Sequence, residues 1–299
     1  MKTNLKSDKK ILVIGAVVID EVIHINKLPQ TGEDVIGVHE NTFVGGCAYN
    51  VQQVINYFGL ANSLFTPIGK GPYSQIIREE LTKKKIPLVI EDDFKDNGWN
   101  ISFVEEDGER TFLTVPGIEA CWKDDWFDRI NLSEYDFIYL SGYELEGQSG
   151  EVITKQLLNK KAPNAKIIFD LGPRMAFISE SVMKSILSAG TIVHCNKSEL
   201  LTLYPDESVE KAAEKLHSLT GEAVIVTLGK DGSYILDKEK ACTLAIKKVQ
   251  VVDTIGAGDS HTGGFISGLA AGLTIEDACR LGNEVSVKVV QQSGGTFTG

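Results

Sequence analysis

The sequence predicts an α/β fold with a parallel-sheet core, helices on both faces of it, and a small β-sheet lid. Short apolar runs alternate with amphipathic segments of helix length along most of the 299 residues, which is the pattern of a parallel sheet covered by helices. Two stretches, at about 18–44 and 99–115, instead alternate polar and apolar residues in strand fashion. We expect one domain over residues 1–299, with the lid inserted from these two stretches. An extra edge hairpin with no gating role would give the same pattern.

The core strands are expected where runs are rich in β-branched residues and apolar on both faces, at 11–16, 137–140, 167–170, 191–194 and 223–228. The covering helices are expected at 48–58, 73–84, 151–158, 208–219, 258–271 and 274–291. Thr274 is expected to cap the last of these helices, because acidic Glu276 and Asp277 follow it in the first turn.

Charge and cysteine usage exclude several classes of partner and compartment. The net charge is −11, and such a field repels nucleic acid and anionic membranes, so neither is expected as a partner. The five cysteines are scattered without a C-x-x-C pair, which favours reduced thiols in a cytoplasmic protein. The apolar run 11–19 ends at Asp20 and Glu21 with no small-residue cleavage site. It is therefore expected to be a buried strand and not a signal peptide.

The segment 253–265 carries the strongest chemical signal. A strand ends there, Gly256, Ala257 and Gly258 form a tight turn of small residues, and an apolar helix follows. Backbone N–H groups at such a turn converge on the helix start, where the helix dipole also favours an anion. Asp259, in the first helical turn, could take a proton from a hydroxyl that attacks a bound phosphate. The alternative is that Asp259 only satisfies the helix N-terminus.

This segment resembles the C-terminal signature of the ribokinase/PfkB family of carbohydrate kinases. The N-terminal signature is present as GGCAYN at 45–50, with Gly59 and Gly69 at the family's spacing, and the likeness runs the length of the chain. The resemblance implies a ribokinase-like, Rossmann-like core with a β-sheet lid, ATP as donor and Mg²⁺ as cofactor. It also implies a frequent K⁺ requirement and a frequent homodimer through the lid.

The same resemblance implies which residues hold the acceptor: Asp20, Gly45, Gly46, Asn50 and Glu144. A carboxylate such as that of Asp20 can accept hydrogen bonds from two neighbouring hydroxyls of a polyol. The two glycines would let the backbone approach a sugar closely, although a tight turn before a helix also uses glycine. A second glutamate two residues after Glu144 competes for its role.

Several residues depart from the family pattern or stand outside it. Cys47 occupies a position where ribose-specific relatives commonly have lysine, and Gln52 replaces a small residue, so ribose itself is in doubt. His261 stands where an aromatic is usual and is expected to pack or to line the pocket. Arg110 and Arg174 could bind a second phosphate on the acceptor, although surface arginines are common.

For the nucleotide, the resemblance implies contacts from Asn196, Thr227, Gly229, Gly232 and Asn283. Glu199 would act on Mg²⁺ largely through water, as suits a cation that keeps its hydration. A capping box between Glu199 and Asn196 is the structural alternative, and the two roles could coexist. Asp253, the carbonyl of Ile255 and a carbonyl near Gly294 resemble ligands of a monovalent-cation site.

Three functions remain open from the sequence. The first is an ATP-dependent kinase that phosphorylates a hydroxyl of a sugar or sugar-like molecule. The second is a nucleoside kinase of the same family, in which Trp99, Phe43 or Tyr49 could stack on a base. The third is a sugar-binding regulator without catalysis, against which the presence of Asp259 and Glu199 argues.

Overall fold

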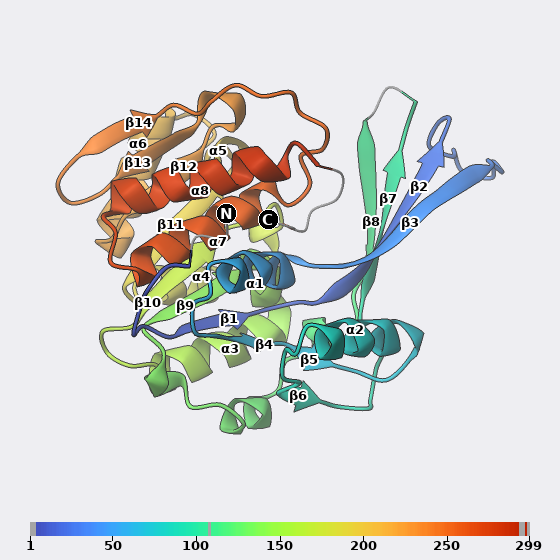
Figure 1. Ribbon diagram of the computed structural model, residues 1–299, viewed down its shortest axis with the longest axis horizontal. Coiled ribbons are helices and arrows are strands. Elements are labelled where there is room, and N and C mark those ends of the chain that lie inside the picture. Colours follow the sequence, from blue (N-terminus) through green and yellow to red (C-terminus); the bar gives the residue numbers. More distant parts are fainter. Residues whose placement is uncertain (1–3, 107–108, 293–296, 298–299) are drawn as a thin grey trace.

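A central sheet of eight strands forms the core of the computed structural model, which describes residues 4–106, 109–292 and 297 (Figure 1). Its spatial order is β14-β13-β12-β11-β10-β9-β1-β4. The strands are β1 Ile11–Ile14, β4 Asn62–Phe65, β9 Phe137–Ser141, β10 Lys166–Asp170, β11 Thr191–Asn196, β12 Val224–Thr227, β13 Ser233–Leu236 and β14 Ala241–Leu244. All neighbouring pairs from β4 to β12 are parallel, and the hairpin strands β13 and β14 are antiparallel. The carboxyl ends of the parallel strands therefore meet along one edge, where ligands bind in open α/β sheets.

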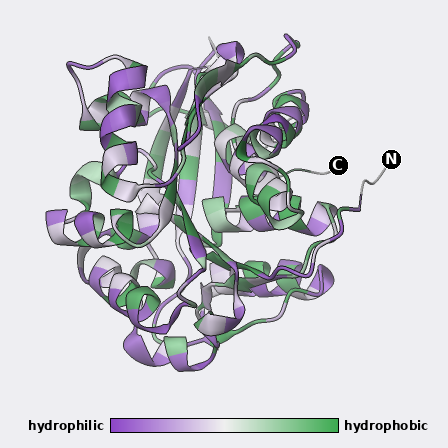
Figure 2. Cartoon of the chain, turned by 90° about the vertical axis from the view of Figure 1, so that its left-hand side faces the viewer, coloured by the Kyte–Doolittle hydropathy of each residue, from purple (hydrophilic) through white to green (hydrophobic). Residues whose placement is uncertain are grey.

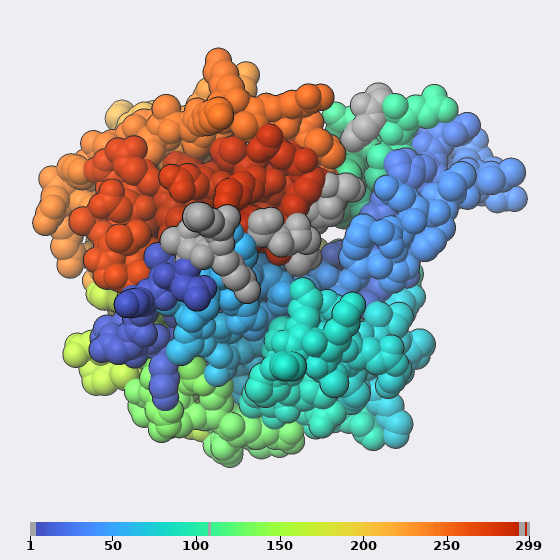
Figure 3. Space-filling view, in the orientation of Figure 1, coloured from blue at the N-terminus to red at the C-terminus, as the bar shows by residue number. Residues whose placement is uncertain are grey.

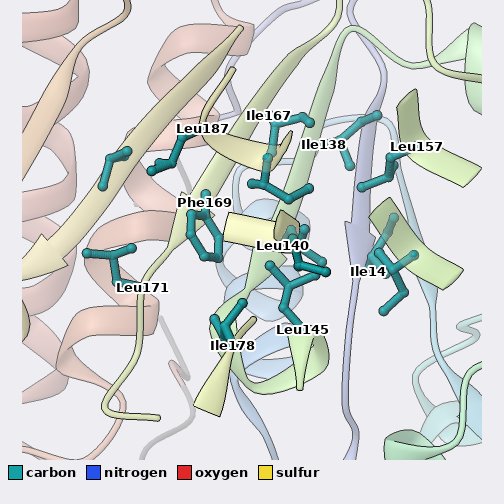
Figure 4. Close-up of a cluster of buried hydrophobic side chains, with 14 of the residues drawn as sticks. Ile14, Ile138, Leu140, Leu145, Leu157, Ile167, Phe169, Leu171, Ile178 and Leu187 are labelled. Atoms are coloured by element: carbon teal, nitrogen blue, oxygen red, sulfur yellow. The ribbon is translucent and has the colours of Figure 1, made fainter. Parts of the chain in front are cut away.

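Helices cover both faces of this sheet. On one side lie α1 Cys47–Tyr57, α2 Pro72–Lys83, α7 Ala257–Ala270 and α8 Ile275–Val289, and on the other lie α3 Gly147–Lys160, α4 Glu180–Leu187, α5 Lys197–Leu203 and α6 Val209–Thr220. Alternate residues of a strand point to opposite faces, and in β1 Leu12 and Ile14 join one hydrophobic cluster while Ile11 and Val13 join the other. Figure 4 shows the first cluster, to which three strands contribute Ile14, Leu140 and Phe169 and a covering helix contributes Leu157. Coloured by hydropathy, the central strands are largely hydrophobic and the outer helix surfaces largely hydrophilic (Figure 2).

A separate sheet of four strands, in the order β3-β2-β7-β8, stands beside the core (Figure 1). Its strands are β2 Val18–Ile25, β3 Gly37–Gly45, β7 Trp99–Val104 and β8 Arg110–Val115. They come from the two stretches whose alternation predicted an accessory sheet. In the space-filling view a groove separates this sheet from the C-terminal part of the core (Figure 3). A third, two-stranded sheet pairs β5 Pro67–Ile68 with β6 Ile90–Glu91.

The predicted fold class is thus confirmed, with differences in single elements. Thr274 caps α8 as expected, because its Oγ1 accepts a hydrogen bond from the Asp277 N–H at 3.1 Å. Two short elements were not predicted from the sequence. These are β4, which has only four residues and begins with two polar ones, and α4, which has only eight residues. Within the described residues, every helix falls short of the length and apolar character that crossing a membrane demands.

Candidate active site

The turn before α7 presents unpaired backbone donors to open space. Gly256 adopts φ 69°, a left-handed conformation that suits glycine, and α7 begins at Ala257. Among the described residues, the N–H groups of Gly258 and Asp259 have no backbone acceptor, as expected in the first turn of a helix. A Cβ built on Gly258 would meet nothing within 4 Å. The turn therefore has both the donors and the room to bind an anion.

Asp259 faces a neighbouring helix and does not cap its own. No side-chain cap closes the N-terminus of α7, and the Asp259 Oδ2 instead accepts a hydrogen bond from Asn50 Nδ2 of α1 at 2.8 Å. The Cys47 thiol also hydrogen-bonds this carboxylate. Burial raises the pKa of Asp259, while the bonds from Asn50 and Cys47 lower it. A carboxylate with a raised pKa is a stronger proton acceptor than an exposed one.

Asp20, at the start of the small sheet, lies close enough to Asp259 to sense its charge. Burial raises the pKa of Asp20 to about 6; the hydrogen bond from Asn100 lowers it, and the charge of Asp259 raises it further. The Asn100 Nδ2 donates to Asp20 Oδ1 at 2.8 Å. A Cβ on Gly45 would come within 2.0 Å of Asp20 Oδ2. Glycine at 45 is therefore required to make room for this carboxylate.

Gly46 and Glu144 support the backbone beside Asp20. Gly46 has φ 102°, and a Cβ there would lie 2.6 Å from the Ala16 carbonyl oxygen. Glu144 is only 3% exposed, and its Oε1 accepts a hydrogen bond from the Ala16 N–H at 2.8 Å. Burial raises the pKa of Glu144 to about 7. The structure thus places Glu144 against the backbone of Gly15 and Ala16.

Strand register identifies the inner face of the small sheet. Asp20 is paired with Phe43 on β3 and with Asn100 on β7, and paired residues share a face. Phe112, two residues from the partner of Asn100 on β8, lies on that same face and is 58% exposed. Asn100 and Phe112 were not predicted from the sequence. Each could be recognised as a polar or an aromatic residue on the same face as Asp20, but only once the pairing of the strands is known.

Two of the aromatic residues considered for stacking on a base do not reach this face. Trp99 pairs with Ile19, on the opposite face from Asp20, and stacks on Tyr73 with ring centroids 5.7 Å apart. Tyr49 is 1% exposed and donates its hydroxyl to Glu80 at 3.0 Å. Gln52 also points elsewhere, since its Nε2 donates to Asn62 Oδ1 at 3.1 Å.

On the nucleotide side, Asn196 and Glu199 form the capping box that was weighed as an alternative. Asn196 Oδ1 accepts from the Glu199 N–H at 2.9 Å, and Glu199 Oε2 accepts from the Asn196 N–H at 2.8 Å. Burial raises the pKa of Glu199, the Asn196 N–H lowers it, and the charge of Asp259 raises it. Glu199 therefore lies within electrostatic reach of the base, and its other oxygen is the kind of ligand that binds hydrated Mg²⁺.

The remaining predicted nucleotide residues lie near the β12–β13 turn. Thr227 Oγ1 donates to the Cys195 carbonyl at 3.4 Å, and Gly229 and Gly232 have φ 59° and 94°. Asn283 Nδ2 donates to Ser233 Oγ at 2.9 Å, which brings α8 to the same turn. This turn also closes a hairpin, because β12 and β13 are antiparallel neighbours.

Asp253 is held by an arginine of the small sheet. Its Oδ1 accepts from the Ile255 N–H at 3.0 Å, and its Oδ2 accepts from Arg110 Nη2 at 3.1 Å. Arg110 shares the inner face with Asn100, so this ion pair bridges the groove from β8 to the core. Gly294, the other residue named for a cation site, lies outside the described residues. Arg174 instead pairs with Glu146 at 2.5 Å.

Comparison with known proteins agrees with this geometry. A family model described as pfkB family carbohydrate kinase matches residues 8–298. An uncharacterized sugar kinase of Escherichia coli K12, YegV, is 32% identical over 97% of this chain and 91% of that protein. A ribokinase from Thermotoga maritima superposes with a TM-score of 0.84 at 27% identity, covering 96% of this chain and 94% of that one. An Arabidopsis thaliana ribokinase, solved with ribose and ATP, has a TM-score of 0.80 at 22% identity over 97% and 94% of the two chains.

Proposed function

The chain belongs to the pfkB family of carbohydrate kinases, and we propose that its sugar kinase reaction uses Asp259 as the base. The observation that carries the proposal is the orientation of Asp259. Its carboxylate faces Asn50 of the neighbouring helix α1, beside N–H groups of Gly258 and Asp259 that have no backbone acceptor among the described residues. A carboxylate that only closed a helix end would instead bond its own first-turn amides.

In this mechanism the acceptor lies between the small sheet and α1. Asp20 accepts hydrogen bonds from two hydroxyls of the sugar, and Asn50 and Asn100 hold the two carboxylates in place. Asp259 removes the proton from the attacking hydroxyl, while the amides of Gly258 and Asp259 stabilise the charge on the transferring phosphoryl group. Thr227, Gly229, Gly232 and Asn283 would contact the nucleotide. Closure of the small sheet, acting as the lid of a single domain, would exclude water that competes for the phosphoryl group.

The Mg²⁺ that the family implies fits the donors present here. When bound, it would neutralise phosphate charge during transfer. Glu199 would hold it through water, because one Glu199 oxygen already accepts the Asn196 N–H and hydrated Mg²⁺ needs only one or two carboxylates.

A sugar is favoured as acceptor because Asp20, Asn50 and Asn100 offer the polar groups that a polyol requires. A nucleoside is the second candidate, and the observation in its favour is Phe112, exposed on the same face as Asp20. An ATP-consumption screen over sugars, sugar phosphates and nucleosides tests the function directly. Phosphoryl transfer to a sugar supports the proposal, transfer to nucleosides alone supports the second candidate, and no transfer to any acceptor supports a regulator.

In the proposal, Arg110 takes the place of the K⁺ that the resemblance implies. Its guanidinium pairs with Asp253 at 3.1 Å and neutralises the charge of that carboxylate. Arg110 then supplies a positive charge next to the Gly256–Gly258 turn, where the phosphoryl group would bind.

We predict that Arg110→Gln makes the kinase responsive to K⁺. Without the guanidinium, Asp253 Oδ2 regains negative charge that a monovalent cation can bind. The rate of Arg110→Gln should rise several-fold when 100 mM NaCl is replaced by KCl, whereas wild type and Arg174→Gln, a surface control, should change less than twofold. ATP affinity, measured by calorimetry in the same two salts, should follow the same order. A strong K⁺ response of wild type would contradict the assignment.

We propose further that the chain acts in the cytoplasm as a homodimer through the small sheet. Its five cysteines are free, as expected in a reducing compartment. On the face opposite Asp20, Leu113 and Val115 are 49% and 37% exposed, which is typical of an interface core.

We predict that Leu113→Glu yields monomers, because a buried unpaired carboxylate is costly in an apolar interface. Light scattering after size exclusion should show a dimer for wild type and for Leu158→Glu, which alters an exposed leucine of α3. A monomeric wild type, or a Leu113→Glu variant that stays dimeric, would refute the interface.

A further inference from the structure

A row of buried polar side chains links the first turn of α7 to the ends of two core strands. Thr262 Oγ1 lies 3.1 Å from Asp170 Oδ2 at the end of β10, and 3.0 Å from His194 Nδ1 of β11. His194 Nε2 lies 2.8 Å from Nδ1 of His261. Thr262 is fully buried, and each histidine is 2% exposed. The phosphoryl-transfer mechanism above uses none of these four side chains.

The row continues toward the nucleotide side. Cys279 Sγ lies 3.7 Å from His261 Nε2 and 3.1 Å from Ser233 Oγ. Ser233 Oγ in turn accepts from Asn283 Nδ2 at 2.9 Å. Hydrogen bonds between side chains therefore extend from Asp170, near Asp259 and Glu199, to the β12–β13 turn that the proposed function assigns to the nucleotide.

The Thr262 hydroxyl is the meeting point of the row. It has one hydrogen, and it also lies 3.0 Å from the Gly258 carbonyl oxygen. Burial raises the pKa of Asp170 well above its usual value, and the protonated acid that this favours can donate to Thr262 as well as accept from it. In the bond between the two histidines, one ring donates an N–H and the other accepts it.

Burial favours the neutral form of both imidazoles, and their ring nitrogens are engaged within the row, so neither ring is available to a substrate. Burial, and then the neighbouring His261, lower the pKa of His194 well below its usual value. Burial lowers the pKa of His261 to about 4, and a hydrogen bond from the ring to the Asn283 side chain opposes this shift. What such a row can do is fix geometry, because each member has its donors and acceptors matched.

Helix α7 needs such an anchor because its packed face has few large side chains. Its sequence, AGDSHTGGFISGLA, carries glycines where it touches its neighbours. A Cβ on Gly264 would lie 2.9 Å from Gly282 Cα, and one on Gly263 would lie 2.7 Å from Val54 Cβ. Contacts between glycines let two helices approach closely. They resist sliding and rotation of α7 against its neighbours less than interdigitated side chains do.

We propose that Thr262, His194 and His261 are positioning residues of phosphoryl transfer, which set the rotation and register of α7 and hence the place of Asp259. Thr262 stands three residues after Asp259, on the same helix face, and it also bonds the Gly258 carbonyl. A change at Thr262 therefore shifts Asp259 together with the Gly256–Gly258 turn that precedes it. The inference rests on the proposed function, since it concerns the same reaction.

The test compares Thr262→Val, which keeps the shape and removes the hydroxyl, with Thr262→Ser, which restores it. A matched control is Thr154→Val on α3, because the buried Thr154 hydroxyl has no hydrogen-bond partner among the described residues. Displacing a reacting group by about 1 Å costs up to about 100-fold in rate. We expect kcat of Thr262→Val to fall ~10- to 100-fold with KM values for ATP and acceptor within about threefold of wild type. Thr262→Ser and Thr154→Val should keep kcat within about threefold.

Equal losses in Thr262→Val and Thr262→Ser, or a Thr262→Val loss that appears in KM alone, would overturn the proposal. A second measurement needs neither turnover nor a variant. Nitrogen NMR of the ¹⁵N-histidine-labelled protein at pH 7 should show His194 and His261 both neutral. A charged imidazolium at either position would equally overturn it. If the chain phosphorylated no sugar, the proposed function would fail while this spectrum still reported on the row.

Discussion

Replacing Asp259 by Asn should lower kcat by about 10²–10⁴-fold while leaving ATP affinity within about threefold of wild type. The amide has nearly the same shape as the carboxylate and can still accept the hydrogen bond from Asn50, which now joins α1 to Asp259 at 2.8 Å. It cannot take a proton from the attacking hydroxyl. Steady-state kinetics with calorimetric titration of ATP would separate the two effects.

The control for this variant is Asp277→Asn, which alters an acid in the first turn of the neighbouring helix α8. It should leave kcat within about twofold, since its carboxylate accepts a hydrogen bond from Thr274 at the start of α8. The pH dependence of kcat gives a second test of the role of Asp259. Burial raises the pKa of Asp259, so wild-type kcat should fall on the acid side as the base becomes protonated, and this acid limb should be absent from Asp259→Asn. Turnover of Asp259→Asn within tenfold of wild type would remove Asp259 from the mechanism.

Replacing Asp20 by Ala should raise the KM for the acceptor ~100-fold or more, with a small effect on the KM for ATP. Two hydrogen bonds from substrate hydroxyls to a carboxylate are lost, and each is worth about 1.5–3 kcal/mol. Glu21→Gln is the matched control, because Glu21 is the next residue and points to the other face, where it accepts from Thr42 at 2.7 Å. Unchanged acceptor KM in Asp20→Ala would place the acceptor elsewhere.

The pH dependence of acceptor binding follows from the pKa of Asp20, which burial raises to about 6. Above that pH the group is a carboxylate that accepts two hydroxyls, and below it the protonated acid loses acceptor capacity. The wild-type KM for the acceptor should therefore be flat above pH 6 and should rise as the pH falls below it. In Asp20→Asn, KM should be high and no longer depend on pH across this range.

Local sequence patterns were sufficient for the parts of the fold that depend on local chemistry. The β-branched runs predicted β1, β9, β10, β11 and β12, and the small-residue turn predicted the start of α7, because these features depend on residues close in sequence. β4 was missed because four residues that begin with Asn-Ser carry too little pattern. Its place in the sheet is decided by pairing with β1, which is a long-range contact.

The candidate site divides in the same way. Asp20, Asn50 and Asp259 were named from motifs, yet the partners that orient them come from distant segments. Asn100 reaches Asp20 through strand register, across 80 positions. Arg110 was weighed as a phosphate ligand, and only the folded chain brings it to Asp253, 143 positions away. The sequence pattern had marked His261 as unusual, whereas its hydrogen bond to His194 depends on packing between α7 and β11.

The most direct test of the central claim is a crystal structure with ADP, a planar phosphoryl mimic such as aluminium fluoride, and the acceptor found in the screen. The account predicts the mimic within hydrogen-bond distance of the Gly258 and Asp259 N–H groups, with the Asp259 carboxylate on the attacking hydroxyl. A mimic bound away from that turn, or an acceptor hydroxyl whose nearest base is another residue, would contradict it.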